Sequence, residues 1–76
     1  MNNKQQLEEV KAKFNKFDVY RNNKNGNLYY VDNVGRDSEN TSIKVAYVDK
    51  DGDLWFRPWE LFLEKFTLVN KGDKKL

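Results

Sequence analysis

One segment constrains this chain more than any other: residues 53–66, DLWFRPWELFLEKF, which place two tryptophans and three phenylalanines in fourteen positions. Side chains alternate along a strand, so Leu54 and Phe56 would share one face and Trp55 and Arg57 the other. Pro58 then ends the strand, because proline has no N–H for a sheet but suits the first turn of a helix. We therefore expect a strand followed by a short helical turn over residues 58–63. The expected core residues here are Leu54, Phe56, Leu61 and Phe62.

The chain has 76 residues with neither cysteine nor histidine. This length predicts one small domain, which must be stabilised by its aromatic core because no disulfide can form. Without histidine, the chain lacks the commonest general base and the commonest metal ligand at neutral pH, so we expect a protein that is not an enzyme and has no cofactor. No apolar run approaches the roughly 20 residues of a membrane span, and the first residues lack the apolar core of a signal peptide. A cytoplasmic protein without a membrane partner is predicted.

The net charge of +2 is unevenly distributed. Residues 1–16 and residues 70–76 each carry +2, whereas residues 17–69 have seven basic and nine acidic side chains. Proteins that bind duplex nucleic acid usually concentrate positive charge on a folded face. Duplex nucleic acid is therefore not an expected partner. Eleven lysines against three arginines, with ten asparagines, indicate low-GC coding of the kind found in some bacteria and their phages.

The rest of the chain is typical of a small β protein. Residues 3–14 predict an amphipathic helix through Leu7, Val10 and Phe14, and this N-terminal segment, 1–16, is expected to pack on the β domain. The pattern of apolar and β-branched residues predicts five strands, at 17–21, 28–34, 43–48, 54–57 and 64–69. Asn25-Gly26 and Asp51-Gly52 supply hairpin turns. Residues 35–42 form a polar loop long enough to lie beside a binding surface, and residues 70–76 a disordered tail.

These elements predict a mainly β fold, a small five-stranded SH3-like barrel over residues 17–69. The barrel carries an N-terminal amphipathic helix and a short helical turn before its last strand. An OB-type barrel is the main alternative, since it also closes five short strands around one core.

Several short blocks have a recognisable order. They are Tyr20-Arg21, Lys24, Gly26, NLYYV at 27–31, DSE at 37–39, VAY at 45–47, LWFRP at 54–58 and Phe62. Together they resemble a bacterial and phage family filed as domain of unknown function 1653, and the LWFRP block with Phe62 is the most specific part. The resemblance implies a small SH3-like barrel and no established activity. Family members typically carry histidines where this chain has Asn22 and Asp37, so any chemistry of those histidines does not transfer.

An acidic run could be mistaken for a calcium loop. Asp49, Asp51, Asp53 and Glu60 match positions 1, 3, 5 and 12 of an EF-hand loop. The glycine position holds Leu54, and a strand-like segment precedes the run where the motif needs a helix. We therefore interpret the run as an acidic hairpin turn and predict no metal site.

Six residues within the family-like blocks are candidates for ligand binding: Tyr20, Arg21, Lys24, Tyr47, Trp55 and Arg57. If Trp55 and Arg57 share a face, the indole can stack on a planar group while the guanidinium binds a carboxylate or phosphate through two hydrogen bonds. In the alternative, both are structural: Trp55 fills the barrel and Arg57 pairs with a carboxylate. The carboxylates considered for that pair are Asp32, Glu60 and Glu64.

Two functions follow from these candidates. The first is a non-catalytic module that binds a small anionic, nucleotide-like ligand, for example a phage protein that sequesters a host immune signalling nucleotide. One small barrel encloses little volume, which favours a pocket shared by subunits of a homo-oligomer. The second is a protein- or peptide-interaction adaptor that uses its aromatic face or a sheet edge and needs no small ligand.

Overall fold

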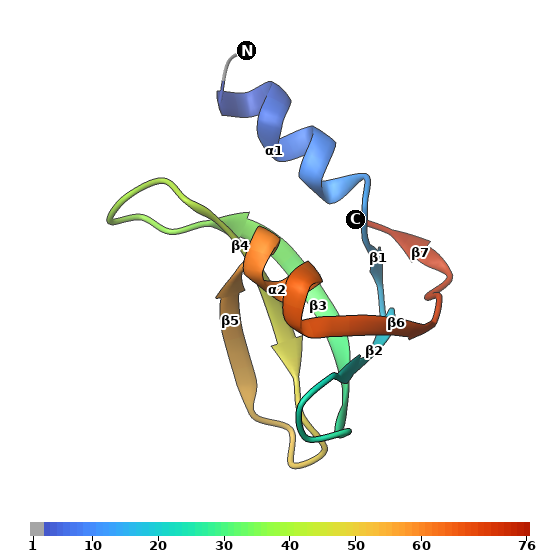
Figure 1. Cartoon of the computed structure of the whole chain (residues 1–76). Coiled ribbons are helices and arrows are strands. Elements are labelled where there is room, and N and C mark those ends of the chain that lie inside the picture. The colour runs from blue at the N-terminus through green and yellow to red at the C-terminus, as the bar shows by residue number, and fades with distance from the viewer. Residues whose placement is uncertain (1–2) are drawn as a thin grey trace.

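The computed structural model of the protein describes residues 3–76, and its secondary structure is mainly β (Figure 1). The elements in chain order are α1 (Asn3–Lys11), β1 (Asn15–Lys16), β2 (Val19–Asn22), β3 (Leu28–Arg36), β4 (Ile43–Val48), β5 (Leu54–Pro58), α2 (Trp59–Lys65), β6 (Phe66–Asn70) and β7 (Lys74–Lys75). Five strands form one antiparallel sheet in the order β5-β4-β3-β2-β6, while β1 pairs with β7. The predicted mainly β class, with a helix before the last strand of the main sheet, is confirmed.

The main sheet is not closed into the five-stranded SH3-like barrel that was expected. Strands β5 and β6 lie at its two edges and do not pair with each other. Helix α2 connects them and lies in front of the sheet in Figure 1. The helix runs two residues beyond the predicted turn, and β6 accordingly begins at Phe66 rather than at residue 64. The candidate groove described below is lined by Arg57 of β5 and by Glu64 and Lys65 at the end of α2.

The core consists of aromatic rings in mutual contact. Phe62 on α2 stacks on Phe66, with ring centres 4.4 Å apart, and meets Tyr20 and Tyr47 at 4.9 and 5.1 Å. Such contacts add about 0.5–1.5 kcal/mol per pair to the burial of the rings. The complete buried cluster is Val10, Phe14, Tyr20, Val31, Val34, Ile43, Val45, Tyr47, Phe62 and Phe66. Because the chain has no cysteine, the packing of this cluster stabilises the fold in place of disulfide bonds.

The N-terminal segment contributes to this core. Helix α1 ends at Lys11, three residues earlier than predicted, and a turn then carries Phe14 into the cluster. Val10 is 2% exposed and Leu7 packs against the same cluster. Of the segment 1–16 that was expected to pack on the β domain, residues 1 and 2 lie outside the described residues.

Three of the four expected core residues of the 53–66 segment lie at the surface. Leu54, Phe56 and Leu61 are 49%, 64% and 37% exposed, so their assignment to the core is wrong. The predicted alternation along β5 holds, because the Arg57 side chain contacts Tyr47 and Phe66 of the core, whereas Leu54 and Phe56 line a hollow on the other face. However, β5 is an edge strand and nothing in the described chain covers its outer face. Phe62, the fourth, is fully buried as predicted.

The C-terminal residues are ordered, contrary to the predicted disordered tail. Strand β7 pairs with β1 in the register Asn15↔Lys75 and Lys16↔Lys74. The Gly72 N–H donates to the buried Asp18 carboxylate at 2.7 Å, and the Asn15 side chain donates to the Gly72 carbonyl at 2.7 Å. Composition alone predicted disorder, whereas these long-range hydrogen bonds hold the segment against β1.

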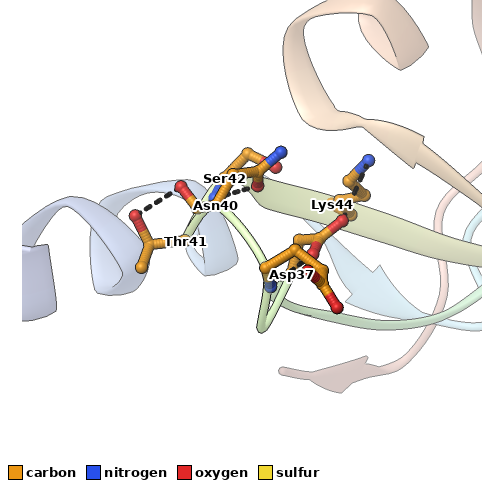
Figure 2. A network of polar contacts seen from close by, with 6 residues as sticks. Asp37, Asn40, Thr41, Ser42 and Lys44 are labelled. Atoms are coloured by element: carbon orange, nitrogen blue, oxygen red, sulfur yellow. Dashed lines mark hydrogen bonds and ion pairs between the residues drawn. The ribbon is translucent and has the colours of Figure 1, made fainter.

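The loop between β3 and β4 is braced by its own polar groups (Figure 2). Asn40 accepts hydrogen bonds from the Thr41 hydroxyl and the Ser42 N–H, and the Asp37 carboxylate lies 3.5 Å from the Lys44 ammonium. The Glu39 N–H, first among several causes, lowers the pKa of Asp37 by donating to its carboxylate. These contacts hold the loop in place, and Asp37 and Lys44 also line the hollow beside β5 that is described below.

Among residues 3–76, no helix is long and apolar enough to cross a membrane.

Candidate anion-binding groove

Arg57 is the central residue of the candidate site. Its Nε donates to the Tyr47 hydroxyl at 3.4 Å, and its guanidinium carbon lies 5.5 Å from the centre of the Phe66 ring. Within the described chain, no carboxylate forms an ion pair with this guanidinium. Both terminal nitrogens, with four N–H donors, are therefore available for a ligand. Aromatic contacts hold the group in place without neutralising its charge.

Arg57 lies in a groove that also contains two lysines. The groove has a volume of about 580 Å³ and is lined by Asn22, Asn23, Lys24, Asn25, Arg57, Glu64 and Lys65. These residues come from the β2–β3 hairpin, from β5 and from the end of α2, around the opening between the two sheet edges. Three cations face one carboxylate, and the volume falls within the range of about 300–1,000 Å³ typical of small-molecule sites.

Three asparagines in the groove add hydrogen-bond donors. The side-chain oxygen of Asn22 accepts from the Lys24 N–H at 2.9 Å, and that of Asn25 from the Asn27 N–H at 2.8 Å. The side-chain oxygen of Asn23 accepts from the Thr67 hydroxyl at 2.6 Å. Because the oxygens are bonded within the protein, the amide NH₂ ends remain as donors. The lining therefore offers mostly N–H groups and positive charge, which suits an anion.

Trp55 lies on the same strand face as Arg57 but outside the lining of the groove. The residue is 51% exposed, and its indole N–H donates to the Asp49 carboxylate at 2.7 Å. Two residues along a strand span about 7 Å, so a single ligand can contact both side chains. This hydrogen bond fixes the orientation of a side chain that is half exposed.

The other predicted site residues have different positions. Tyr20 and Tyr47 are both 4% exposed and belong to the core, so neither presents its ring to a ligand. Burial, with a smaller effect of Asp18, raises the pKa of Tyr20 to about 12. Arg21 pairs with Leu28 on the outer face of the sheet, away from Arg57. Of the six predicted residues, the structure brings together only Lys24 and Arg57 in the groove.

Sequence reasoning missed Lys65 and the asparagines of the hairpin, whereas it considered Glu64 only as an ion-pair partner of Arg57. Lys65 is the last residue of α2, and the Asn23 N–H donates to its carbonyl at 2.9 Å. This bond joins the hairpin to the helix across more than 40 residues of sequence. The only local signal was the concentration of asparagine at residues 22–27, which was interpreted as turn chemistry alone.

In the acidic turn between β4 and β5, the Asp49 carboxylate accepts hydrogen bonds from nearby residues. Asp49 accepts the N–H groups of Asp51 and Asp53 as well as the Trp55 indole. Within residues 3–76 there is no cluster of three or more histidine, cysteine, aspartate or glutamate side chains arranged to hold a metal ion. The side chain of Asp49 thus stabilises the turn, in agreement with its interpretation as an acidic hairpin turn.

Comparison with known protein families gave a match that covers most of the chain. A family model described as "Protein of unknown function (DUF1653)" matches residues 18–74. The chain belongs to this family. The match confirms the resemblance seen in residues 20–62 and extends it at both ends, while α1 and β1 precede the matched region. Lys24, Arg57 and Lys65 all lie within the span shared with the DUF1653 family. Neither the search of curated proteins nor the search of solved structures found a match.

Proposed function

We propose that this DUF1653 protein is a non-catalytic module that binds a small anionic, nucleotide-like ligand in the groove around Arg57. The observation that supports the proposal is the guanidinium itself, which is held by Tyr47 and Phe66 and has no carboxylate partner in the described chain. A structural arginine would normally pair with an acidic residue. This one shares its groove with Glu64 but makes no ion pair with it.

Phosphate is the anion that fits this lining best. Arginine binds phosphate through two parallel hydrogen bonds, and lysine supplies a point charge beside it. Lys24 and Lys65 flank Arg57 in the groove, and the asparagine amides add neutral donors. A base or other planar group would then lie on the exposed ring of Trp55. Binding without turnover suits a role in sequestering a signalling nucleotide, including one used in host defence against phage.

Calorimetry with mono-, di- and cyclic nucleotides and with inorganic phosphate tests the proposal. We expect at least one nucleotide to bind and Arg57→Met to weaken it by roughly 10- to 100-fold, because a hydrogen bond to a charged group contributes about 1.5–3 kcal/mol. Methionine keeps an apolar side chain near Phe66, and a thermal melt verifies folding. Arg21→Met is the matched control, since Arg21 is exposed on the opposite face and should leave affinity unchanged.

The absence of binding across the panel, or equal effects of the two arginine variants, would contradict the proposal. Because the groove is open, a second copy could close over it. Mass measured by light scattering with and without nucleotide tests whether the ligand site is shared by two subunits.

A second function, peptide binding at the β5 edge, is favoured by one observation. Leu54 and Phe56 are exposed on the outer face of this edge strand and line a hollow of about 490 Å³ with Ala46. An extended peptide that adds to β5 as a further strand would cover both side chains. This function predicts a protein partner whose direct binding is lost in Phe56→Ser but kept in Arg57→Met. The opposite pattern would exclude it.

A further inference from the structure

The two basic flanks of the sequence meet in the folded protein. Strand β1 pairs with β7, and Lys16 stands directly opposite Lys74. Like charges at directly opposed positions of two strands repel each other and destabilise the pair. Lys71 is also exposed in the segment that leads to β7. The structure thus gathers positive charge from both ends of the chain on one side of the molecule.

An exposed aromatic pair lies beside these lysines. Phe17 was predicted to begin a strand but instead has a left-handed backbone, with φ of 68°, and its side chain is 53% exposed. Its ring centre lies 5.8 Å from that of Tyr30, which is 39% exposed, and the Lys16 ammonium lies 5.5 Å from the Phe17 ring centre. A positive φ is strained for a bulky residue. The chain therefore has a strained backbone at a residue whose apolar side chain is exposed to solvent.

A hollow connects the ring to the lysines. Its volume is about 470 Å³, and its lining consists of Phe17, Asn70, Lys71, Gly72, Asp73 and Lys74. Asp73 is the only carboxylate in this lining. The nearby Asp18 carboxylate is buried and accepts the N–H groups of Asn15 and Gly72. The surface formed by Phe17, Tyr30, Lys16, Lys71 and Lys74, here named the Phe17 face, therefore combines aromatic rings with excess positive charge.

We propose that the Phe17 face binds single-stranded nucleic acid, with a base stacked on Phe17 or Tyr30 and the backbone phosphates beside Lys16, Lys71 and Lys74. Stacking on aromatic side chains next to a basic groove is the usual way in which proteins hold single strands without reading sequence. A phosphate beside Lys16 and Lys74 would also relieve their mutual repulsion. Bases paired within a duplex cannot reach these rings, and an acidic peptide would use the lysines alone. This site is separate from the groove around Arg57.

Fluorescence anisotropy of the full chain with labelled oligo(dT) and oligo(U) of about 12 nucleotides tests the proposal. We expect binding at low salt whose logarithm falls with the logarithm of salt concentration with a slope near −2, from about 0.7 per phosphate contact at three lysines. Phe17→Asn should weaken binding roughly tenfold, because base stacking on an aromatic ring is lost. Asparagine tolerates a positive φ, so this variant should remain folded.

Lys74→Gln should weaken binding and reduce the salt slope by about 0.7. Lys50→Gln, which changes an exposed lysine in the β4–β5 turn, is the matched control and should bind like the unmodified chain. If Phe17→Asn failed to fold, the double change Lys71→Gln with Lys74→Gln would decide the question, since both side chains are exposed.

Three results would overturn the proposal: no binding at low salt, equal binding by the Phe17→Asn or lysine variants, or equal affinity for duplex DNA, poly-glutamate or anionic vesicles. Arg57→Met should leave oligonucleotide binding intact. Loss of nucleotide binding in the groove and loss of oligonucleotide binding on the Phe17 face are therefore distinguishable.

Discussion

The contact between Trp55 and Asp49 shows how a single carboxylate organises the turn before β5. The indole N–H donates to one carboxylate oxygen at 2.7 Å, and the backbone of Asp51 and Asp53 donates to the other. The bond from Trp55 is the main reason that the pKa of Asp49 lies below its ordinary value of 3.8. Protonation of this group would neutralise its charge and weaken its hydrogen bonds with these donors.

This contact predicts a specific acid sensitivity. Because the folded pKa is lowered, the stabilisation by Asp49 is complete above its unfolded pKa, near 4, and is lost as pH falls through the folded value. Asp49→Asn should therefore be less stable than the unmodified chain at neutral pH, and the difference should shrink below about pH 4. Denaturant titrations followed by Trp55 emission, in a Trp59→Phe background, measure this.

Asp51→Asn in the same turn is the control, because the Asp51 carboxylate accepts no hydrogen bond within residues 3–76. A difference between Asp49→Asn and the unmodified chain that stays constant from pH 7 to pH 3 would contradict the assigned role of the carboxylate.

At the scale of elements, the pairing of β1 with β7 depends on close approach of two backbones. A Cβ added at Gly72 would collide with the carbonyl oxygen of Lys16 and crowd the backbone of Asp18. Gly72 has no positive φ, so space rather than conformation requires glycine here. The absence of a side chain therefore allows the last residues to dock on β1.

Gly72→Ala should consequently destabilise the protein by about 1–3 kcal/mol, the usual effect of forcing extra volume into a packed site. It should also increase amide hydrogen exchange in β1 and β7. Gly35→Ala is the matched control, because a Cβ at Gly35 meets nothing within 4 Å. Equal thermal stability of the two variants would mean that the C-terminal segment does not dock as described.

At the scale of the whole molecule, the core extends beyond the region shared with the family. The matched region begins at residue 18, yet Val10 and Phe14 precede it and are 2% and 1% exposed. Phe14 meets Tyr20 and Phe62 with ring centres about 6 Å apart. We therefore predict that helix α1 unfolds together with the sheet.

Val10→Ala should lower the free energy of unfolding by about 1–3 kcal/mol, since it removes two buried methyl groups and leaves a cavity. The adjacent change Glu9→Ala affects an exposed position and should alter stability by no more than about 0.5 kcal/mol. Chemical denaturation of both variants tests this. Equal stabilities would show that α1 folds independently of the sheet.

The sequence by itself determined the local features of this protein. The β-branched run from Ile43, the turns at Gly26 and Gly52, and the stop at Pro58 all depend on residues that are close in the chain. The two turn glycines have φ of 76° and 84°, as hairpin chemistry requires. The mainly β class, the helix before the last strand of the main sheet and the alternation along β5 could be predicted for the same reason.

Only the tertiary structure decided which of these side chains are covered and which charges meet. Phe56 and Phe62 are equally apolar, but strand order leaves β5 at an edge, so Phe56 is exposed and Phe62 is buried. Likewise, Arg57 meets Lys24 and Lys65, and Lys16 faces Lys74, through contacts between segments far apart in sequence. Periodicity reports which residues share a face of one element, whereas burial and local charge depend on what packs against that face.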